Sequence, residues 1–512
     1  MMTTLRFVLF TLLALALTVL RGAVSWAAEL PNVLFIVSDD HAAYVSGAYG
    51  NPQARTPNLD RFARTGVVFT QAFCNSPLCT ASRQSLLTGK LPHSIGVTLL
   101  RTPLSPETTT LADVLAQAGY DTAAYGKMHF NSGLNHGFDE HLDRRDHAGF
   151  LEANPPRPIP EGLDVLPRWR PFRDPASIWL NGMYAPYGAY EADMAGTWFA
   201  RQARHFLERQ PEDDPFFLMV SFYEPHSPFH FPIEYANSFD PDAFEAPEVR
   251  PEDNDQIPEI FRNLTEEQKR NIIAAYYTST EYMDRNVGRV LDALDESGHA
   301  DDTLVIYLGD HGYSLGHHGR FEKHTMFEES VHSPLIIRTP DMNQLGQRTD
   351  ALVEFIDLFP TVMDYCGLEG PDDLEGISLM PCLEQPNDPA VGRDYVFSEY
   401  YEHEEAMIRT HEYKYIYQRG EHLREDGYQT GLPMTGPSKQ LYSLRTDPRE
   451  TTNLAHDESY QELIARMEEV MLERFHQTHP KADEMTEGLT RDEQLSFFLR
   501  YRPEPTSLEG AR

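Results

Sequence analysis

The chain has 512 residues, with 79 Asp or Glu against 43 Lys or Arg, so its formal net charge at pH 7 is −36. It is too long for one ordinary domain, and its acidic balance disfavours nucleic acid and anionic membranes as partners. The charge itself is typical of solubility in a salty medium. An anionic substrate would be repelled at long range, so a site for one must concentrate cationic groups locally.

Residues 1–28 have the pattern of a secretory signal peptide. Arg6 precedes an apolar run over 7–20, and small residues follow, so we expect cleavage after Ala27 or Ala28. The alternative is an uncleaved membrane anchor, but Arg21 cuts the apolar run short of the usual span. The pattern predicts a secreted or periplasmic protein without a stable membrane partner.

Next, short apolar runs alternate with segments of helical periodicity. Strands are expected at 32–37, 67–72, 122–125, 216–222, 303–308 and 333–338, and helices at 58–65, 80–87, 110–118, 266–297 and 353–365. This alternation favours an α/β fold with a large, mostly parallel sheet sandwiched by helices. The segment 140–190 has little periodicity, and so long a loop in a compact domain is usually functional.

The pattern of predicted elements changes near Pro386. Short aromatic-rich segments at 395–400 and 413–417, a strand at 440–444 and a helix at 462–475 are expected there. They predict a smaller C-terminal antiparallel sheet with a helix. We therefore divide the chain after residue 28 into an N-terminal α/β domain over 29–385 and a C-terminal α+β subdomain and tail over 386–512. Residues 484–512 are expected to be a surface arm or poorly ordered.

Cys79 lies in the run Ser-Pro-Leu-Cys-Thr-Ala-Ser-Arg-Gln-Ser-Leu-Leu-Thr-Gly over 76–89. Thr80 or Ser82 can cap a helix that Gly89 closes, which places Cys79 at a helix N-terminus. Free N–H groups and the positive end of the helix dipole favour a bound anion there, and Arg83 lies one turn further on. The alternative is a structural cysteine, either as a thiol or in a disulfide with Cys74.

Acidic residues follow two of the predicted strands. Ser-Asp-Asp-His at 38–41 follows the first strand, and Gly-Asp-His-Gly at 309–312 follows the strand at 303–308. Open α/β sheets bind their ligands at the carboxyl ends of the strands. Three carboxylates from two distant segments are costly to bring together without a cation, so we expect a metal site. A solvated turn is the alternative for either motif alone.

Basic groups follow other predicted strands. Lys127 and His129 come after the strand at 122–125, and His226 lies in Glu-Pro-His-Ser-Pro after the strand at 216–222. Lys323 lies in Phe-Glu-Lys-His beyond the Gly-Asp-His-Gly motif. Each alone is a weak signal, but together they supply the positive charge that an anion site in an acidic protein requires.

The run around Cys79 closely resembles the signature of the type I sulfatases, C-x-P-S-R followed by a short helix ending in T-G. This chain has Ala81 where the commonest signature has Pro. The other motifs are similar to that family in order and spacing from about Pro31 to Cys366, and again over 439–450. The chain thus resembles formylglycine-dependent sulfatases of the alkaline-phosphatase-like superfamily.

This resemblance implies that a maturation enzyme oxidises Cys79 to formylglycine, whose hydrated form is the nucleophile. It implies one divalent cation, usually Ca²⁺, bound by Asp39, Asp40, residue 79, Asp310 and His311. It also implies that Arg83 and Lys127 hold the formylglycine, that His129 takes a proton, and that His226 and Lys323 contact the sulfate and the leaving oxygen. An amide is commoner than His311 at its position, and imidazole is not a typical Ca²⁺ ligand.

The implied activity is hydrolysis of a sulfate ester, with a sulfated small molecule or glycan as substrate. The alternative is a phosphonate monoester or phosphodiester hydrolase of the same superfamily, because phosphonate-hydrolysing relatives have Asp and His among their metal ligands and bind transition metals. A third alternative is a binding protein that keeps Cys79 as a thiol. Candidates for substrate specificity are Arg144, Arg145, Trp169, Arg170 and Arg409.

If Cys79 is modified, Cys74, Cys366 and Cys382 remain, and at most one intramolecular disulfide is possible. Cys366 with Cys382 is the plausible pair, but the sequence leaves this open.

Overall fold

The computed structural model describes residues 30–166, 180–340, 346–420, 427–432 and 436–503. The predicted signal peptide, Trp169 and Arg170 lie outside the described residues. No described helix is long and apolar enough to cross a membrane.

An eight-stranded sheet forms the centre of the molecule, in the order β5-β4-β6-β1-β7-β8-β2-β9. The five strands from β5 to β7 are parallel, β8 is antiparallel to both of its neighbours, and β2 pairs parallel with β9. The predicted mostly parallel sheet is confirmed. In sheet order the strands are Glu140–Leu142, Asp121–Gly126, Phe216–Pro225, Asn32–Asp39, Thr303–Gly309, Leu335–Arg338, Val67–Phe69 and Gln347–Thr349.

The central strand β1 shows why its sequence is apolar without alternation. All of its residues are buried, and it pairs with β6 on one side and β7 on the other. Val33, Phe35 and Val37 enter one hydrophobic core, whereas Leu34 and Ile36 enter another on the opposite face. Because both faces are covered by helices, neither set of side chains can be polar.

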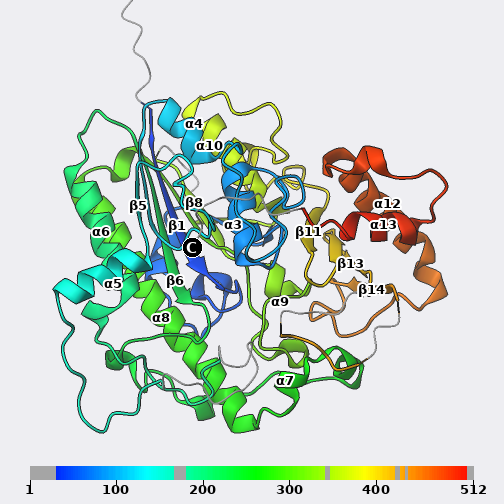
Figure 1. The fold of residues 1–512 in the computed structure, drawn as a ribbon, viewed down its shortest axis with the longest axis horizontal. Coiled ribbons are helices and arrows are strands. Elements are labelled where there is room, and N and C mark those ends of the chain that lie inside the picture. The colour runs from blue at the N-terminus through cyan, green and yellow to red at the C-terminus, as the bar shows by residue number, and fades with distance from the viewer. Residues whose placement is uncertain (1–29, 167–179, 341–345, 421–426, 433–435, 504–512) are drawn as a thin grey trace, which may run out of the picture.

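Helices cover the two faces of this sheet (Figure 1). One core contains side chains from α2, α6 and α8, and the other contains side chains from α3, α4 and α10. The bounds are Pro57–Ala63 for α2, Cys79–Thr88 for α3, Leu111–Gln117 for α4, Ala195–Arg209 for α6, Glu266–Ser297 for α8 and Leu358–Cys366 for α10.

Shorter elements fill the connections. The predicted loop 140–190 contains β5 and α5, so its first part is regular structure. The short helices are α5 Arg144–Ala153, α7 Glu259–Arg262, α9 Glu328–Val331 and α11 Met380–Glu384. Turns of 3₁₀ helix occur at Gly47–Tyr49, Glu191–Asp193, Ile233–Tyr235, Pro241–Ala243, Pro251–Gln256, Ala300–Asp302, His317–Gly319, Phe355–Asp357, Glu458–Tyr460 and Ala482–Glu484.

Two predicted elements are divided in the structure. The predicted strand at 67–72 splits into β2 and β3, Ala72–Phe73. The predicted helix at 353–365 begins instead with β10, Val353–Glu354, which pairs with β3, and becomes helical from Phe355. The apolar run itself does not distinguish a buried strand from a buried helix.

The capping prediction for α3 was wrong. Leu78 is the N-cap residue and makes no side-chain capping bond. Thr80 and Ser82 lie inside the first turn, where their hydroxyls donate to the carbonyl oxygens of Leu100 and Asp310 at 2.7 and 2.5 Å. Gly89 closes the helix in the left-handed conformation, as predicted.

A smaller domain-like unit follows, a four-stranded antiparallel sheet covered by helices (Figure 1). The sequence did not predict β12, and the expectation of an arm after residue 484 was wrong, because Leu495, Phe498 and Leu499 of α13 are buried against α12 and the sheet. The bounds are Val396–Tyr400 for β11, Glu405–Arg409 for β12, Tyr413–Gln418 for β13, Ser438–Ser443 for β14, Gln461–Thr478 for α12 and Arg491–Leu499 for α13. The domain boundary at residue 385 stays a prediction.

All four cysteines are buried free thiols. Cys366 and Cys382 are therefore not bonded, and neither are Cys74 and Cys79. The Cys366 thiol lies in hydrogen-bonding contact with Tyr120.

Candidate active site

The predicted site residues converge at the carboxyl ends of four adjacent parallel strands, β4, β6, β1 and β7. A cavity of about 480 Å³ opens there, beside the first turn of α3. Seven of the predicted residues line it, namely Asp39, Asp40, Cys79, Lys127, His129, His226 and Lys323. The other three predicted residues are almost wholly buried and contact the lining residues without lining the cavity themselves. They are Arg83, Asp310 and His311.

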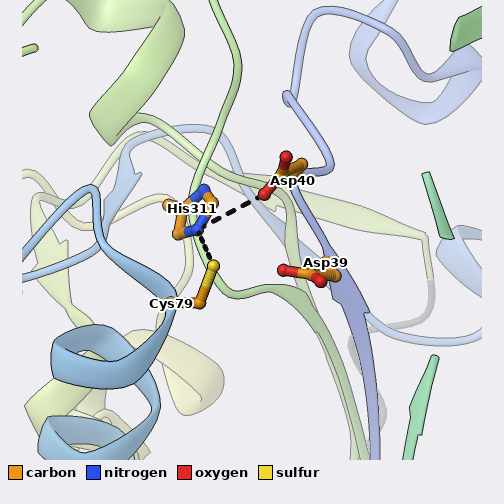
Figure 2. Close-up of side chains that lie close together, drawn as sticks. All are labelled: Asp39, Asp40, Cys79 and His311. Carbon is orange, nitrogen blue, oxygen red and sulfur yellow. Dashed lines mark hydrogen bonds and ion pairs between the residues drawn. The ribbon is translucent and has the colours of Figure 1, made fainter. Parts of the chain in front are cut away.

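Cys79 is the first residue of α3, and its side chain faces the loops that follow β1 and β7 (Figure 2). Its Sγ lies 3.2 Å from Nε2 of His311 and 3.0 Å from Nζ of Lys323. No side chain caps the helix, so the positive end of the helix dipole faces the same space. Burial raises the pKa of the Cys79 thiol, although Lys127 and Lys323 lower it.

Ligand atoms of Asp39, Asp40, Cys79 and His311 all lie within 4.8 Å of one another (Figure 2). Asp39 ends β1, and Asp40 follows it with a left-handed φ of 64°. Oδ1 of Asp39 and Oδ2 of Asp40 are buried without a hydrogen-bond partner. Buried carboxylate oxygens that accept no hydrogen bond, beside an imidazole nitrogen, fit a divalent cation.

Asp310 lies against this group but is engaged differently. Its Oδ1 accepts from the backbone N–H groups of Asp40 and His311, both at 3.0 Å. Its Oδ2 accepts from Nε of Arg83 at 2.7 Å. Asp310 therefore fixes the backbone of two candidate ligands and the side chain of Arg83, and its own predicted role as a ligand stays a prediction.

Arg83 and Lys127 bring positive charge to the base of the site. Nη1 of Arg83 donates to the carbonyl oxygen of Lys127 and to Oγ of Ser221, both at 2.5 Å. Nη2 of Arg83 lies 3.7 Å from Oδ1 of Asp39, and Nζ of Lys127 forms an ion pair with Oδ2 of the same residue. The cationic groups of Arg83 and Lys127 are thereby both held beside the carboxylate of Asp39.

The adjacent carboxylates differ in acidity. Burial opposes ionisation of Asp39, but Lys127, His226 and Arg83 hold its pKa well below the usual value. Burial raises the pKa of Asp40 to about 7, although Nζ of Lys323 lies 2.6 Å from its Oδ1. A bound divalent cation would replace a proton here and stabilise both carboxylates in their charged form.

The imidazoles are oriented by their second nitrogens. Nδ1–H of His311 donates to the carbonyl oxygen of Gly312 at 3.0 Å, which leaves Nε2 as the acceptor that faces Cys79. Nδ1–H of His226 donates to the carbonyl oxygen of Ser227 at 2.7 Å, and its Nε2 lies 4.0 Å from Oδ2 of Asp40. The His226 side chain is 25 % exposed, so it can reach a molecule in the cavity.

His129 lines the cavity from the loop after β4. Its Nδ1 is 3.2 Å from Oγ1 of Thr80, and its φ is 59°. Burial, Lys127 and Arg83 hold the pKa of His129 well below its usual value, so the imidazole is neutral and can accept a proton.

Of the predicted specificity residues that the structure describes, only Arg144 lines the cavity. Arg145 does not line it, and Arg409 is buried on β12, where its Nε lies 3.4 Å from Oε1 of Glu328. Glu224 and His324 also line the cavity, and both stand in the motifs that contain His226 and Lys323. Sequence reasoning missed several other polar lining residues, because no motif marks them. These are Arg101, Asn131, Tyr223, His230, Tyr313 and Tyr428.

Comparison with known families identifies this chain. The sequence profile named Sulfatase matches residues 31–368, which include every predicted site residue. The chain belongs to the sulfatase family. A second profile, named N-sulphoglucosamine sulphohydrolase, C-terminal, matches residues 316–477 of this sulfatase.

Curated relatives agree with that assignment. The sulfatase is 30 % identical to an arylsulfatase of Clostridium perfringens over 476 residues, which cover 87 % of this chain and 94 % of the relative. It is 28 % identical to an N-acetylglucosamine-6-O-sulfatase of Bacteroides thetaiotaomicron, with 90 % of each chain covered. The protein is therefore a sulfuric ester hydrolase.

Solved structures share the fold. A phosphonate monoester hydrolase of Agrobacterium radiobacter superposes with a TM-score of 0.74 at 25 % identity and covers 90 % of this chain and 98 % of its own. A structure in complex with D-glucosamine-2-N,6-O-disulfate superposes with a TM-score of 0.70 at 24 % identity, covering 89 % and 99 %.

Proposed function

We propose that this sulfatase hydrolyses the sulfate ester of a sulfated carbohydrate by means of a formylglycine formed at Cys79 and one divalent cation. The observation that carries the proposal is the place of Cys79. It lies at the N-terminus of α3, with its Sγ 3.0 Å from Nζ of Lys323 and 3.2 Å from Nε2 of His311, in one group with Asp39 and Asp40, each of which has a buried carboxylate oxygen that accepts no hydrogen bond. The names of relatives, such as N-acetylglucosamine-6-O-sulfatase, support a sugar substrate.

The cation is proposed to be Ca²⁺, held by Asp39, Asp40, His311 and residue 79, with Asp310 as a further ligand. When bound, it supplies positive charge opposite the sulfuryl oxygens. Hydrated formylglycine supplies a nucleophilic oxygen and a second hydroxyl, and the second hydroxyl allows release of sulfate with recovery of the aldehyde. Serine lacks that second hydroxyl.

The basic side chains complete the chemistry. Arg83, Lys127 and Lys323 stabilise negative charge as it develops on the sulfuryl oxygens. Neutral His129 accepts a proton from residue 79, and His226 donates one to the departing sugar oxygen. Without substrate, burial and Lys323 hold the pKa of His226 well below its usual value. A bound sulfate would raise this pKa by adding negative charge nearby.

Mass spectrometry and turnover together test the nucleophile. Protein made with a competent maturation enzyme should carry a peptide about 18 Da lighter at Cys79 and should hydrolyse 4-nitrophenyl sulfate. Cys79→Ala is the matched control, which should lack both the mass change and the activity. An active preparation in which Cys79 is wholly unmodified would contradict the proposal.

Phosphonate or phosphodiester hydrolysis is the second candidate. The structural similarity to a phosphonate monoester hydrolase and the imidazole of His311 in the candidate metal group favour it. Comparison of kcat/KM for an aryl sulfate and an aryl phosphonate separates the two. A clear preference for the aryl phosphonate would mean that phosphonate hydrolysis, rather than sulfate ester hydrolysis, is the main activity.

We also propose that residues 1–28 are a signal peptide and that the mature enzyme is secreted or periplasmic. The proposal rests on the sequence pattern alone. N-terminal sequencing of the exported protein should find its start at Ala28 or Glu29, and retention of residues 1–28 would contradict it.

A further inference from the structure

Two arginines border the cavity outside the proposed catalytic group. Arg101 follows Leu100, whose carbonyl oxygen accepts from Oγ1 of Thr80 at 2.7 Å and from Nδ2 of Asn131 at 2.8 Å. These two bonds hold the backbone at Leu100, directly before Arg101, against α3 and against the loop after β4. Arg144 begins α5, directly after β5, the strand that neighbours β4.

Arg144 is held in place by stacking. Its guanidinium lies over the ring of Tyr223, 4.3 Å from the ring centroid. Tyr223 belongs to β6 and stacks in turn on Phe199 of α6. Asp143 caps the helix that begins at Arg144. A guanidinium that stacks on an aromatic face keeps its N–H edge available for a planar anion.

Neither arginine forms an ion pair with any described residue. This is notable in a chain with a net charge of −36, where Arg204, Arg209 and Arg289 each pair with a carboxylate. The carboxyl group of Glu224 also lines the cavity, where burial raises its pKa to about 7 although the charge of Arg144 lowers it. The two side chains attract each other without forming a close ion pair. Two exposed guanidinium groups without a close ion pair thus line the same cavity as the proposed catalytic residues.

We propose that Arg144, assisted by Arg101, binds a second anionic group of the substrate. The substrate class would be a sugar sulfate that carries a further carboxylate or sulfate, rather than a neutral sugar with one sulfate. The inference rests on the proposed function and extends it. Local cations at the rim offset the repulsion that the acidic protein exerts on such a polyanion. A cavity of about 480 Å³ is in the size range of small-ligand sites.

Matched substrate pairs test this subsite. Glucosamine 2-N,6-O-disulfate carries an N-sulfate where N-acetylglucosamine 6-sulfate carries an N-acetyl group, and glucuronate 2-sulfate carries a carboxylate where glucose 2-sulfate carries a hydroxymethyl group. For each pair, turnover is measured where it occurs, and inhibition of 4-nitrophenyl sulfate hydrolysis is measured in every case. The wild-type enzyme should prefer the doubly anionic member of at least one pair by about tenfold. The preferred pair identifies the second group as sulfate or carboxylate.

Three variants complete the test. Arg144→Gln should reduce that preference about tenfold, mainly through KM or Ki, and Arg101→Gln should reduce it less. Arg145→Gln is the matched control, because it removes an exposed arginine of the same helix that does not line the cavity. It should retain the preference.

Two outcomes would overturn the subsite. One is the absence of any preference in both turnover and inhibition, and the other is an Arg144→Gln variant that loses activity equally on both members of a pair. Failure of the wild-type enzyme to hydrolyse 4-nitrophenyl sulfate would instead count against the proposed function.

Discussion

At the scale of single residues, the position of His226 makes its role measurable. Its Nε2 faces Asp40 at the edge of the proposed metal group, and its side chain remains 25 % exposed to the cavity. A group so placed can contact either the leaving oxygen or a sulfuryl oxygen. The two roles differ in their dependence on the basicity of the leaving group.

His226→Ala should damage hydrolysis of sugar sulfates more than that of 4-nitrophenyl sulfate. A sugar alkoxide must be protonated as the S–O bond breaks, whereas nitrophenolate leaves unaided, and general acid help contributes ~10²–10⁴-fold. kcat/KM on both substrates is the measurement. His230→Ala, which alters another cavity residue, should not separate the two substrates. Equal losses for His226→Ala would make Lys323 the better candidate for the acid.

Asp310→Asn tests the fifth proposed metal ligand. The change removes one carboxylate from the site and also weakens the 2.7 Å bond to Arg83. We expect metal affinity to fall about 10–100-fold, together with activity. Metal content and activity are measured after chelation and stepwise return of Ca²⁺, Mg²⁺ or Mn²⁺, with Asp39→Asn for comparison. If activity falls while the metal content stays full, Asp310 is not a metal ligand. Its role is then limited to its contacts with Arg83 and the backbone.

At the scale of elements, one buried lysine joins the small sheet to the catalytic segment that carries Lys323. Lys414 of β13 is fully buried, and its Nζ donates to the carbonyl oxygen of Met326 at 2.9 Å. The same atom lies 2.9 Å from Oε1 of Glu328 and 2.7 Å from Oε1 of Glu450. Glu450 also accepts from the backbone N–H of Glu328, the first residue of α9.

Lys414→Met should destabilise the protein by about 3–5 kcal/mol, because it leaves the buried carboxylate of Glu450 without its cation and leaves Glu328 with Arg409 alone. Lys439→Met is the matched control from the neighbouring strand β14. Lys439 pairs with Glu468 and Asp492 but is 33 % exposed, so its loss should cost less than about 1 kcal/mol. Urea unfolding followed by fluorescence measures both. Equal losses of stability in the two variants would contradict the prediction, because the buried network would then contribute no more than the exposed ion pairs of Lys439.

At the scale of the whole molecule, buried neutral histidines link stability to pH. His479 follows α12 and packs among the rings of His93, Phe498 and Tyr501. Burial lowers the pKa of His479 to about 3. In the unfolded chain this histidine takes up a proton below about pH 6.5, whereas in the folded chain it does so only near pH 3. Its contribution to stability is therefore full above about pH 6.5 and declines as the pH falls toward 3.

His479→Gln should flatten the dependence of the unfolding free energy on pH between about 4 and 6. One histidine contributes a slope of about 1.4 kcal/mol per pH unit in that window, with stability rising as the pH rises. The measurement is the difference in slope between variant and wild type, which cancels the effect of the overall acidic charge. His476→Gln, an exposed change on α12, should leave the slope as it is. An unchanged slope in His479→Gln would contradict the assignment.

Much of this protein follows from its sequence alone. Apolar runs without alternation predict strands buried on both faces, and β1 is such a strand, with its side chains divided between two cores. Polar motifs directly after those runs predict their meeting at one sheet edge, where Asp39, Lys127, His226 and His311 do meet. The predicted α8 has the observed bounds, because the local capping signal at Thr265 agrees with the long apolar periodicity.

Other features depend on contacts between distant segments. Val353 belongs to a strand only because β3 lies beside it, and α13 is a buried helix only because α12 offers its apolar face. Arg144 and Arg409 are equally plausible anion ligands in the sequence, but one stacks at the cavity rim and the other is buried beside Glu328. Sequence patterns thus determined the elements and the chemistry of the site, whereas tertiary packing decided which isolated side chains reach the cavity, since no local signal records a neighbour hundreds of residues away.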